Sequence, residues 1–209
     1  MKAKEIFYML GIRPNYKFCQ SEKIYYGNFN GEDVFFQQWK PPKYQNEELK
    51  AKEIKDLQEF LSDGDVAIDI GAHIGDSALP IALACGKKGK VFAFEPNPVV
   101  FQILSINSNL NRNLTNIEPI PYACTDKEQS LIFNYDTPWL ANGGNKSKYN
   151  FTHGAAFKLP IIGVNPYVFL KESYKDYLHR IKYIKIDVEG FDYSVDRKST
   201  RLNSSHTSI

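Results

Sequence analysis

The sequence has no long apolar run and little cysteine. None of its apolar stretches approaches the roughly 18–20 residues needed to cross a bilayer, and residues 6–12 are too short a run for a signal peptide. Cys19, Cys85 and Cys124 are an odd number, at spacings that suit neither a zinc site nor a redox pair. We therefore expect a cytoplasmic protein with reduced thiols and no membrane partner.

Strong charge of one sign is also missing. The net charge is only +2, whereas proteins that bind nucleic acid usually cluster Lys and Arg to neutralise phosphates. Nucleic acid is therefore not an expected partner. With 43% hydrophobic residues against 24% charged ones, the chain of 209 residues carries enough apolar side chain for one globular core.

The chain divides into three parts by composition. Residues 1–61 are interpreted as a lead-in, in which Asn30-Gly31 supplies the positive φ angles of a hairpin turn and Asn46 caps a helix over 46–61. Residues 62–195 form the main domain. Residues 196–209 lose the aromatic and apolar content and resemble the translation of a sequencing adapter, so we interpret them as a non-native tail.

The main domain has the pattern of repeated strand–helix units. The sequence predicts helices over 76–84, 98–110 and 173–180, strands over 66–70, 90–94, 116–120, 130–135, 159–164 and 183–188, and a long polar loop over 136–148. The first of these strands is apolar on both faces, as in strands buried within a parallel sheet. The expected fold class is therefore α/β, with a doubly wound, mainly parallel sheet.

A glycine-rich turn follows the first of these strands. Its sequence, Asp69-Ile70-Gly71-Ala72-His73-Ile74-Gly75, should expose backbone N–H groups at a helix N-terminus and let a ligand approach the main chain. The spacing differs from the Gly-x-Gly-x-x-Gly of dinucleotide binding, so a cofactor without a pyrophosphate fits better. Asp69 would repel phosphates and suits the ammonium and sulfonium charges of S-adenosylmethionine.

A second acid ends the next strand. Glu95 stands 24 residues after Gly71, where a carboxylate can accept hydrogen bonds from both hydroxyls of a ribose. The glycine turn and Glu95 together predict a site for an adenosine-containing cofactor.

With the later motif Ile184-Lys185-Ile186-Asp187-Val188-Glu189-Gly190, these residues resemble the FkbM-like family of class I S-adenosylmethionine-dependent methyltransferases. The resemblance covers the chain from about Asp65 to Val195, with the three motifs in the family's order. Val164-Asn165 departs from it, because the family more often has Leu-Asp there. The resemblance implies that Gly71, Ala72 and Gly75 line the methionine part of the cofactor, that Glu95 binds ribose, and that Ala123 to Asp126 lies beside adenine. The cofactor-binding residues expected in total are Asp69, Gly71, Ala72, Gly75, Glu95, Asn97, Ala123 and Asp126.

The resemblance also implies a Rossmann-like methyltransferase sheet of seven strands, in which residues 183–188 form the fourth. The later strands would then be encoded beyond Val195 and are missing from this chain. An unpaired strand edge promotes aggregation, so we expect residues 1–209 alone to be poorly soluble and inactive.

Asp187 and Glu189 are the candidate catalytic residues. They stand two apart, so a regular strand would turn both side chains to the same face, at the sheet edge where α/β proteins bind ligands. Either could remove a proton from the methyl acceptor, and His73 and His153 are alternatives for that base. No metal is expected, because its further oxygen ligands would have to come from the missing region.

The favoured function is methyl transfer to an oxygen of a sugar or another small-molecule acceptor. A nucleotide-dependent oxidoreductase is the enzyme alternative, which the glycine spacing disfavours. A catalytically inactive cofactor-binding module is the alternative that is not an enzyme. The sequence gives no indication of the oligomeric state.

Overall fold

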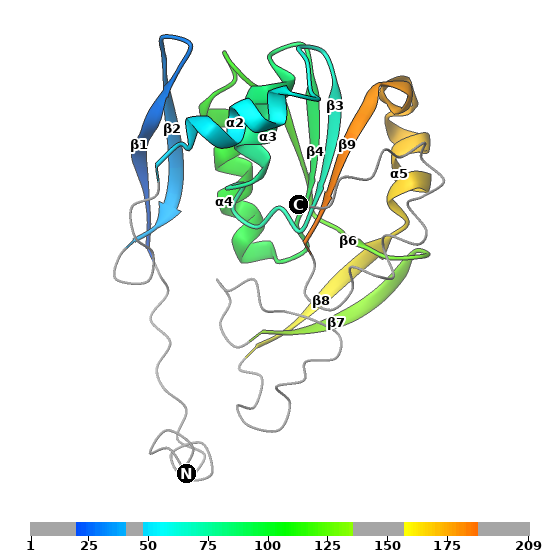
Figure 1. Cartoon of the computed structure of the whole chain (residues 1–209). Helices are drawn as coiled ribbons and strands as arrows, with labels where there is room; N and C mark the ends of the chain where they lie inside the picture. The colour runs from blue at the N-terminus through cyan, green and yellow to red at the C-terminus, as the bar shows by residue number, and fades with distance from the viewer. Residues whose placement is uncertain (1–19, 41–47, 136–156, 188–209) are drawn as a thin grey trace, which may run out of the picture.

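The computed structural model describes residues 20–40, 48–135 and 157–187 (Figure 1). Several sequence-based predictions fall outside these ranges. They are the polar loop over 136–148, His153, Glu189 and the tail at 196–209. Within the described parts, no helix is long and apolar enough to span a bilayer.

The central sheet has four parallel strands in the order β5-β4-β3-β9. Their bounds are β3 Val66–Ile70, β4 Lys90–Phe94, β5 Ile117–Ile120 and β9 Ile181–Ile186. Every residue of β3 and β4 is buried, as their apolar composition predicts. The strand order runs outward from β3 in both directions, which confirms a doubly wound sheet and puts its topological switch point between β3 and β9.

Helices cover both faces of this sheet (Figure 1). On one face lie α3 (Ala78–Cys85) and α4 (Pro98–Leu110), which pack against Ala67, Val91 and Ala93. On the other, α5 (Pro166–Ser173) and the short 3-10 helix η1 (Lys175–Arg180) cover the remaining strand residues. The predicted helix over 173–180 corresponds to η1, which is a 3-10 helix and starts two residues later. The sequence analysis missed α5, although Asn165 caps it and Pro166 occupies its first turn, where proline is tolerated.

The N-terminal lead-in is a hairpin followed by a helix. Strands β1 (Ser21–Phe29) and β2 (Glu32–Trp39) pair around Asn30 and Gly31, whose φ angles of 53° and 88° confirm the predicted turn. Helix α2 (Ala51–Gln58) begins later than predicted, with Lys50 at its N-cap instead of Asn46. The physical reason is that the Leu49 N–H donates to the Tyr26 carbonyl, which holds the chain before α2 against the hairpin.

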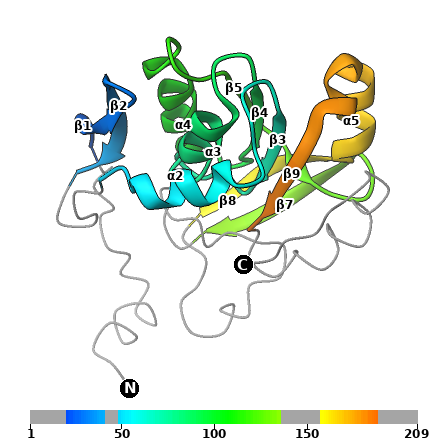
Figure 2. The same ribbon diagram turned by 45° about the horizontal axis from the view of Figure 1, so that its top comes forward.

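A smaller sheet lies beyond the carboxyl ends of the central strands (Figures 1 and 2). It contains β6 (Ala123–Cys124), β8 (Phe157–Val164) and β7 (Gln129–Tyr135) in that order. The sequence predicted β7 and β8 but missed β6, because a two-residue strand has no periodicity to detect. This arrangement puts the smaller sheet on the side of the switch point where ligands of such folds bind.

Candidate functional site

Three chain segments meet at the carboxyl edge of the central sheet. The N–H groups of Gly71 and Ala72 both donate to the Phe94 carbonyl at 3.0 Å, which ties the glycine turn to the end of β4. The Asp187 N–H donates to the Ile70 carbonyl at 2.9 Å, which ties the residue after β9 to the end of β3. The glycine turn and Asp187 are thus brought together, as the position of their motifs at strand ends predicts.

The glycine turn adopts backbone angles that its sequence makes accessible. Gly71 and Gly75 have φ values of 82° and 97°, in the region that glycine enters without steric cost. His73, with φ at 49°, is in the left-handed region without that freedom. The turn therefore stores strain at His73, next to the residues expected to contact the cofactor.

Four backbone N–H groups of the turn donate within the protein, whereas the sequence predicted that they would be exposed to a ligand. Those of Gly71 and Ala72 donate to Phe94, that of His73 to Glu95, and that of Gly75 to the Ala72 carbonyl. The turn uses these donors to hold itself together, so they do not form a phosphate cradle. This geometry fits a cofactor without a pyrophosphate.

Glu95 connects the glycine turn to the start of α4. Its Oε2 accepts the His73 N–H at 3.0 Å, and its Oε1 accepts the Asn97 N–H at 2.8 Å. Burial raises the pKa of Glu95 to about 7, against the lowering effect of these two hydrogen bonds. Each carboxylate oxygen keeps capacity for another donor, which two neighbouring ribose hydroxyls can supply.

The Asn97 side chain caps α4. Its Oδ1 accepts the N–H groups of Val99 and Val100 at 3.0 and 3.5 Å, with Pro98 in the first turn. That Asn97 binds the cofactor stays a prediction, and its side-chain oxygen is used to cap the helix. Asn97 also helps to fix the site, because its backbone N–H donates to Glu95 Oε1.

Asp69 is fully buried beneath the turn. Its carboxylate accepts the Ser77 hydroxyl at 2.6 Å and lies 3.3 Å from the Lys185 ammonium. That Asp69 offers its charge directly to the cofactor stays a prediction; each of its carboxylate oxygens already has one partner within the protein. Its role in this structure is to fix Ser77 and Lys185 at the switch point.

Lys185 is a site residue that the sequence reasoning missed. It pairs in register with Asp69, and its Nζ lies 3.6 Å from Asp187 Oδ2. Burial alone would lower the pKa of Lys185, but the charges of Asp69 and Asp187 outweigh that effect and raise the pKa, so Lys185 stays cationic. A signal was available, since Asp69 is the one charge in an otherwise apolar predicted strand and implies an opposite charge on a neighbouring strand.

The candidate bases differ in their surroundings. Asp187 is mostly exposed, with a side-chain exposure of 71%, and so is open to solvent at the sheet edge. The His73 ring is mostly buried and lies with Nδ1 3.8 Å from Asp76 Oδ1. Glu189 and His153 lie outside the described residues.

Ala123 and Asp126 belong to the smaller sheet and the turn after it. Ala123 is buried in β6 and packs with Phe133 and Ile161. Asp126 is exposed, and its carbonyl accepts a hydrogen bond from the Asn165 side chain. Asn165, which departs from the family pattern, thus joins the N-terminus of α5 to this turn.

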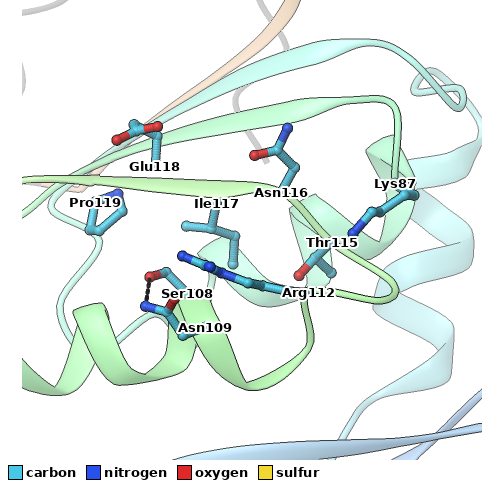
Figure 3. Close-up of a pocket in the computed structure, with 9 residues that line it drawn as sticks. All are labelled: Lys87, Ser108, Asn109, Arg112, Thr115, Asn116, Ile117, Glu118 and Pro119. Atoms are coloured by element: carbon cyan, nitrogen blue, oxygen red, sulfur yellow. Dashed lines mark hydrogen bonds between the residues drawn. The ribbon is translucent and has the colours of Figure 1, made fainter.

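A surface hollow of about 490 Å³ lies at the opposite edge of the sheet (Figure 3). It is lined by residues of β5, by residues that precede β4 and β5 and by the end of α4, with Lys87, Arg112 and Asn116 among them. Because the glycine turn follows β3, this hollow is separate from the candidate site. Among the described residues, no group of three or more His, Cys, Asp or Glu is placed to hold a metal ion.

A doubly wound parallel sheet with a glycine turn and an acid at adjacent strand ends defines an α/β protein that binds a nucleoside cofactor. The sequence profile of the family described as "Methyltransferase FkbM domain" matches residues 69–195, which include all three motifs. The chain belongs to this methyltransferase family. Membership confirms the resemblance and makes S-adenosylmethionine the cofactor.

One curated relative is the hexuronic acid methyltransferase AglP of Haloferax volcanii. It is 32% identical over 142 residues, which are 68% of this chain and 53% of AglP, so the chain spans about half the length of this relative. The chain is also similar to solved structures. One is P. horikoshii TYW2 in complex with MeSAdo, with 22% sequence identity and a TM-score of 0.35; the match covers 56% of this chain and 46% of TYW2. Another is Trm5b from Pyrococcus abyssi, at 17% identity and a TM-score of 0.32, covering 84% of this chain and 46% of that one.

Proposed function

We propose that the protein transfers a methyl group from S-adenosylmethionine to an oxygen of a sugar, with a hexuronic acid as the acceptor class. The observation that carries the proposal is the position of Glu95. Its buried carboxylate follows β4, accepts two backbone N–H groups, and lies within the part of the chain that matches the family. The acceptor class rests on the name of the relative AglP.

The residues around Glu95 fit this cofactor. Glu95 has acceptor capacity for two ribose hydroxyls, and the turn from Gly71 to Gly75 has no open row of donors that would require a phosphate. Asp69, Lys185 and Asp187 carry one net negative charge, which favours a cationic ligand at this edge. The same two observations weigh against a nucleotide-dependent oxidoreductase.

When bound, S-adenosylmethionine supplies a methyl group on a positively charged sulfur. The chain must hold the acceptor oxygen in line with that group and take up a proton when the acceptor is a hydroxyl. We assign the proton to Glu189 or Asp187, both of which follow β9 in the sequence. Asp187 is exposed at the sheet edge, with its Oδ2 3.6 Å from the Lys185 ammonium, so its carboxylate is accessible to an acceptor.

The proposal predicts which ligands the complete protein binds. S-adenosylhomocysteine should bind in a calorimetric titration, and NAD should not. Incubation with methyl-labelled S-adenosylmethionine and a glucuronic-acid-containing oligosaccharide should move the label to the sugar, with the matching neutral hexose oligosaccharide as control. Tight NAD binding without any response to S-adenosylhomocysteine would refute the proposal. Label transfer to both oligosaccharides alike would refute only the acceptor class.

Glu95 predicts a pH dependence of cofactor binding. The ribose hydroxyls need the ionised carboxylate, and with a pKa of about 7 only about one tenth of Glu95 is ionised at pH 6. The affinity for S-adenosylhomocysteine should therefore fall about tenfold from pH 8 to pH 6, as measured by calorimetry.

The stability of the unliganded protein should follow the opposite trend. Because the folded state holds the Glu95 proton more tightly than the unfolded state, this contribution to stability is full at low pH and is lost as the pH rises through about 7.

The control for the affinity measurement is Glu95→Gln, which should bind S-adenosylhomocysteine at least about tenfold more weakly at pH 8, since charge-assisted hydrogen bonds contribute about 1.5–3 kcal/mol each. Its affinity should not change with pH. A wild-type affinity that is equally flat would rule out Glu95 as the ribose ligand.

A further inference from the structure

Two asparagines of α4 hold the N-terminal hairpin. Asn107 lies in the last turn of α4, and Asn111 follows the end of the helix; both are 1% exposed. The Asn111 amide accepts the Phe35 N–H at 3.0 Å and donates to the Phe35 carbonyl at 2.8 Å. The Asn107 amide makes the same pair of hydrogen bonds with Gln37, at 2.6 and 2.9 Å. The two side chains thus act as a substitute third strand on the free edge of β2.

The geometry of the two elements explains this match. Residues two apart on a strand point their backbone groups to the same edge, about 6.6 Å apart. Residues four apart on a helix lie on the same face, about 6 Å apart along the axis. A pair of amides at positions 107 and 111 can therefore replace the hydrogen-bonding groups of a neighbouring strand at Phe35 and Gln37.

Asn107 makes a further contact that Asn111 lacks in this structure. Its second amide hydrogen donates to the Ile74 carbonyl of the glycine turn at 2.7 Å, in a buried position. The preceding residue, His73, donates its N–H to Glu95. Successive residues of the turn are thus held from two sides, by Glu95 and by Asn107, at the point where His73 has its unfavourable positive φ.

The turn also packs closely against this part of α4. A Cβ atom built on Gly75 would lie 3.1 Å from Leu104 Cδ1 and 3.7 Å from Asn107 Cβ. There is little space for the turn to shift while Asn107 stays in position. A rotation of the Asn107 amide would break its hydrogen bonds to Ile74 and Gln37 together, because one rigid planar group makes them all.

We propose that Asn107 is a positioning residue that couples the β1–β2 hairpin to the cofactor-binding turn, an inference that rests on the cofactor site proposed above. The hairpin precedes the part of the chain that matches the family, yet one buried amide connects it to the centre of the site. In this arrangement the hairpin stabilises the conformation of the turn that binds the cofactor, through Asn107 and without touching the ligand itself.

Asn111 provides a matched control in the same protein. Asn107→Leu and Asn111→Leu each remove an amide of the same size and leave the backbone of one β2 residue without its partner. Both variants should lower the melting temperature of the complete protein by a similar amount. Only Asn107→Leu also removes the partner of Ile74 in the glycine turn.

The test combines ligand affinity with amide hydrogen exchange. Asn107→Leu is expected to weaken S-adenosylhomocysteine binding about tenfold and to speed exchange in both β2 and residues 71–77, whereas Asn111→Leu should speed exchange in β2 alone and leave the affinity unchanged within about twofold. If leucine prevents folding, Asn107→Ser and Asn111→Ser replace the pair, because serine is small and keeps a polar group.

Equal effects of the two substitutions on the turn and on affinity would overturn the coupling, since a merely structural role of Asn107 would not single out the turn. A wild-type protein that binds no S-adenosylhomocysteine would contradict the proposed function. The exchange comparison would then still decide the coupling, because it needs no ligand.

Discussion

Glu189→Gln is expected to lower methyl transfer about 10²–10⁴-fold while the affinity for S-adenosylhomocysteine stays near normal. Glutamine keeps the size and hydrogen-bonding capacity of glutamate but cannot take up a proton as a general base. The measurement is turnover at saturating cofactor, with calorimetry to confirm unchanged binding. Asp187→Asn is the matched variant, because it neutralises the other carboxylate of the same motif.

The pair of variants also distinguishes the acceptor oxygen. A hexuronic acid offers hydroxyls, which must lose a proton on methylation, and a carboxylate, which needs no base at neutral pH. A large loss in one variant alone identifies the base for a hydroxyl acceptor. Wild-type turnover in both variants would contradict a role for either acid as the base and would leave a histidine base or methylation of the carboxylate as the explanation.

Lys185→Met is expected to lower the free energy of unfolding by about 3–5 kcal/mol, because it leaves the buried Asp69 carboxylate without its cation. Urea unfolding measures the effect.

Two further variants serve as controls. Lys182 is an exposed lysine of the same strand, so Lys182→Met should change the free energy of unfolding by less than about 0.5 kcal/mol. The double variant Asp69→Asn with Lys185→Met should recover most of the loss, since no charge is then buried. A Lys185→Met protein as stable as Lys182→Met would show that Asp69 does not depend on this partner.

The elements defined by local signals were predicted residue for residue. Strands β3 and β4 and helix α4 have the expected bounds, because each is marked by neighbouring residues alone. For α4, Asn97 and Pro98 define the start through hydrogen bonding and backbone geometry within one turn. The hairpin was predicted for the same reason, from Asn30 and Gly31.

The errors arise where distant parts of the chain determine the structure. The start of α2 depends on a hydrogen bond from Leu49 to Tyr26, and no local pattern near Asn46 reports it. The backbone donors of the glycine turn were expected to be free, because the sequence does not show that the Phe94 carbonyl and Glu95 accept them. Sequence reasoning thus predicted which strand ends meet at this edge of the sheet, but not which of their groups were already paired.

The same limit explains why Lys185 and Asn107 were missed. Each acts through a partner far away in the sequence: Asp69 is 116 residues from Lys185, and Gln37 is 70 residues from Asn107. Lysine in a strand and asparagine in a helix are individually common, so their importance becomes visible only when the partner is known. Pairing lone polar residues between predicted buried strands would have suggested the first contact, whereas the second depends on tertiary packing.

The position of β9 beside β3 also determines the order in which this site can form during protein synthesis. The hairpin, the glycine turn, Glu95 and α4 are all made before residue 112, and their contacts with one another are complete without β9. Asp69 then has Ser77 but not Lys185 as a partner until the ribosome has added the strand Ile181–Ile186. Closing a contact over 116 residues is slow compared with local pairing. The nascent chain therefore passes through a stage in which all residues of the glycine turn, Glu95 and the hairpin are present and the strand that carries Lys185 is still absent.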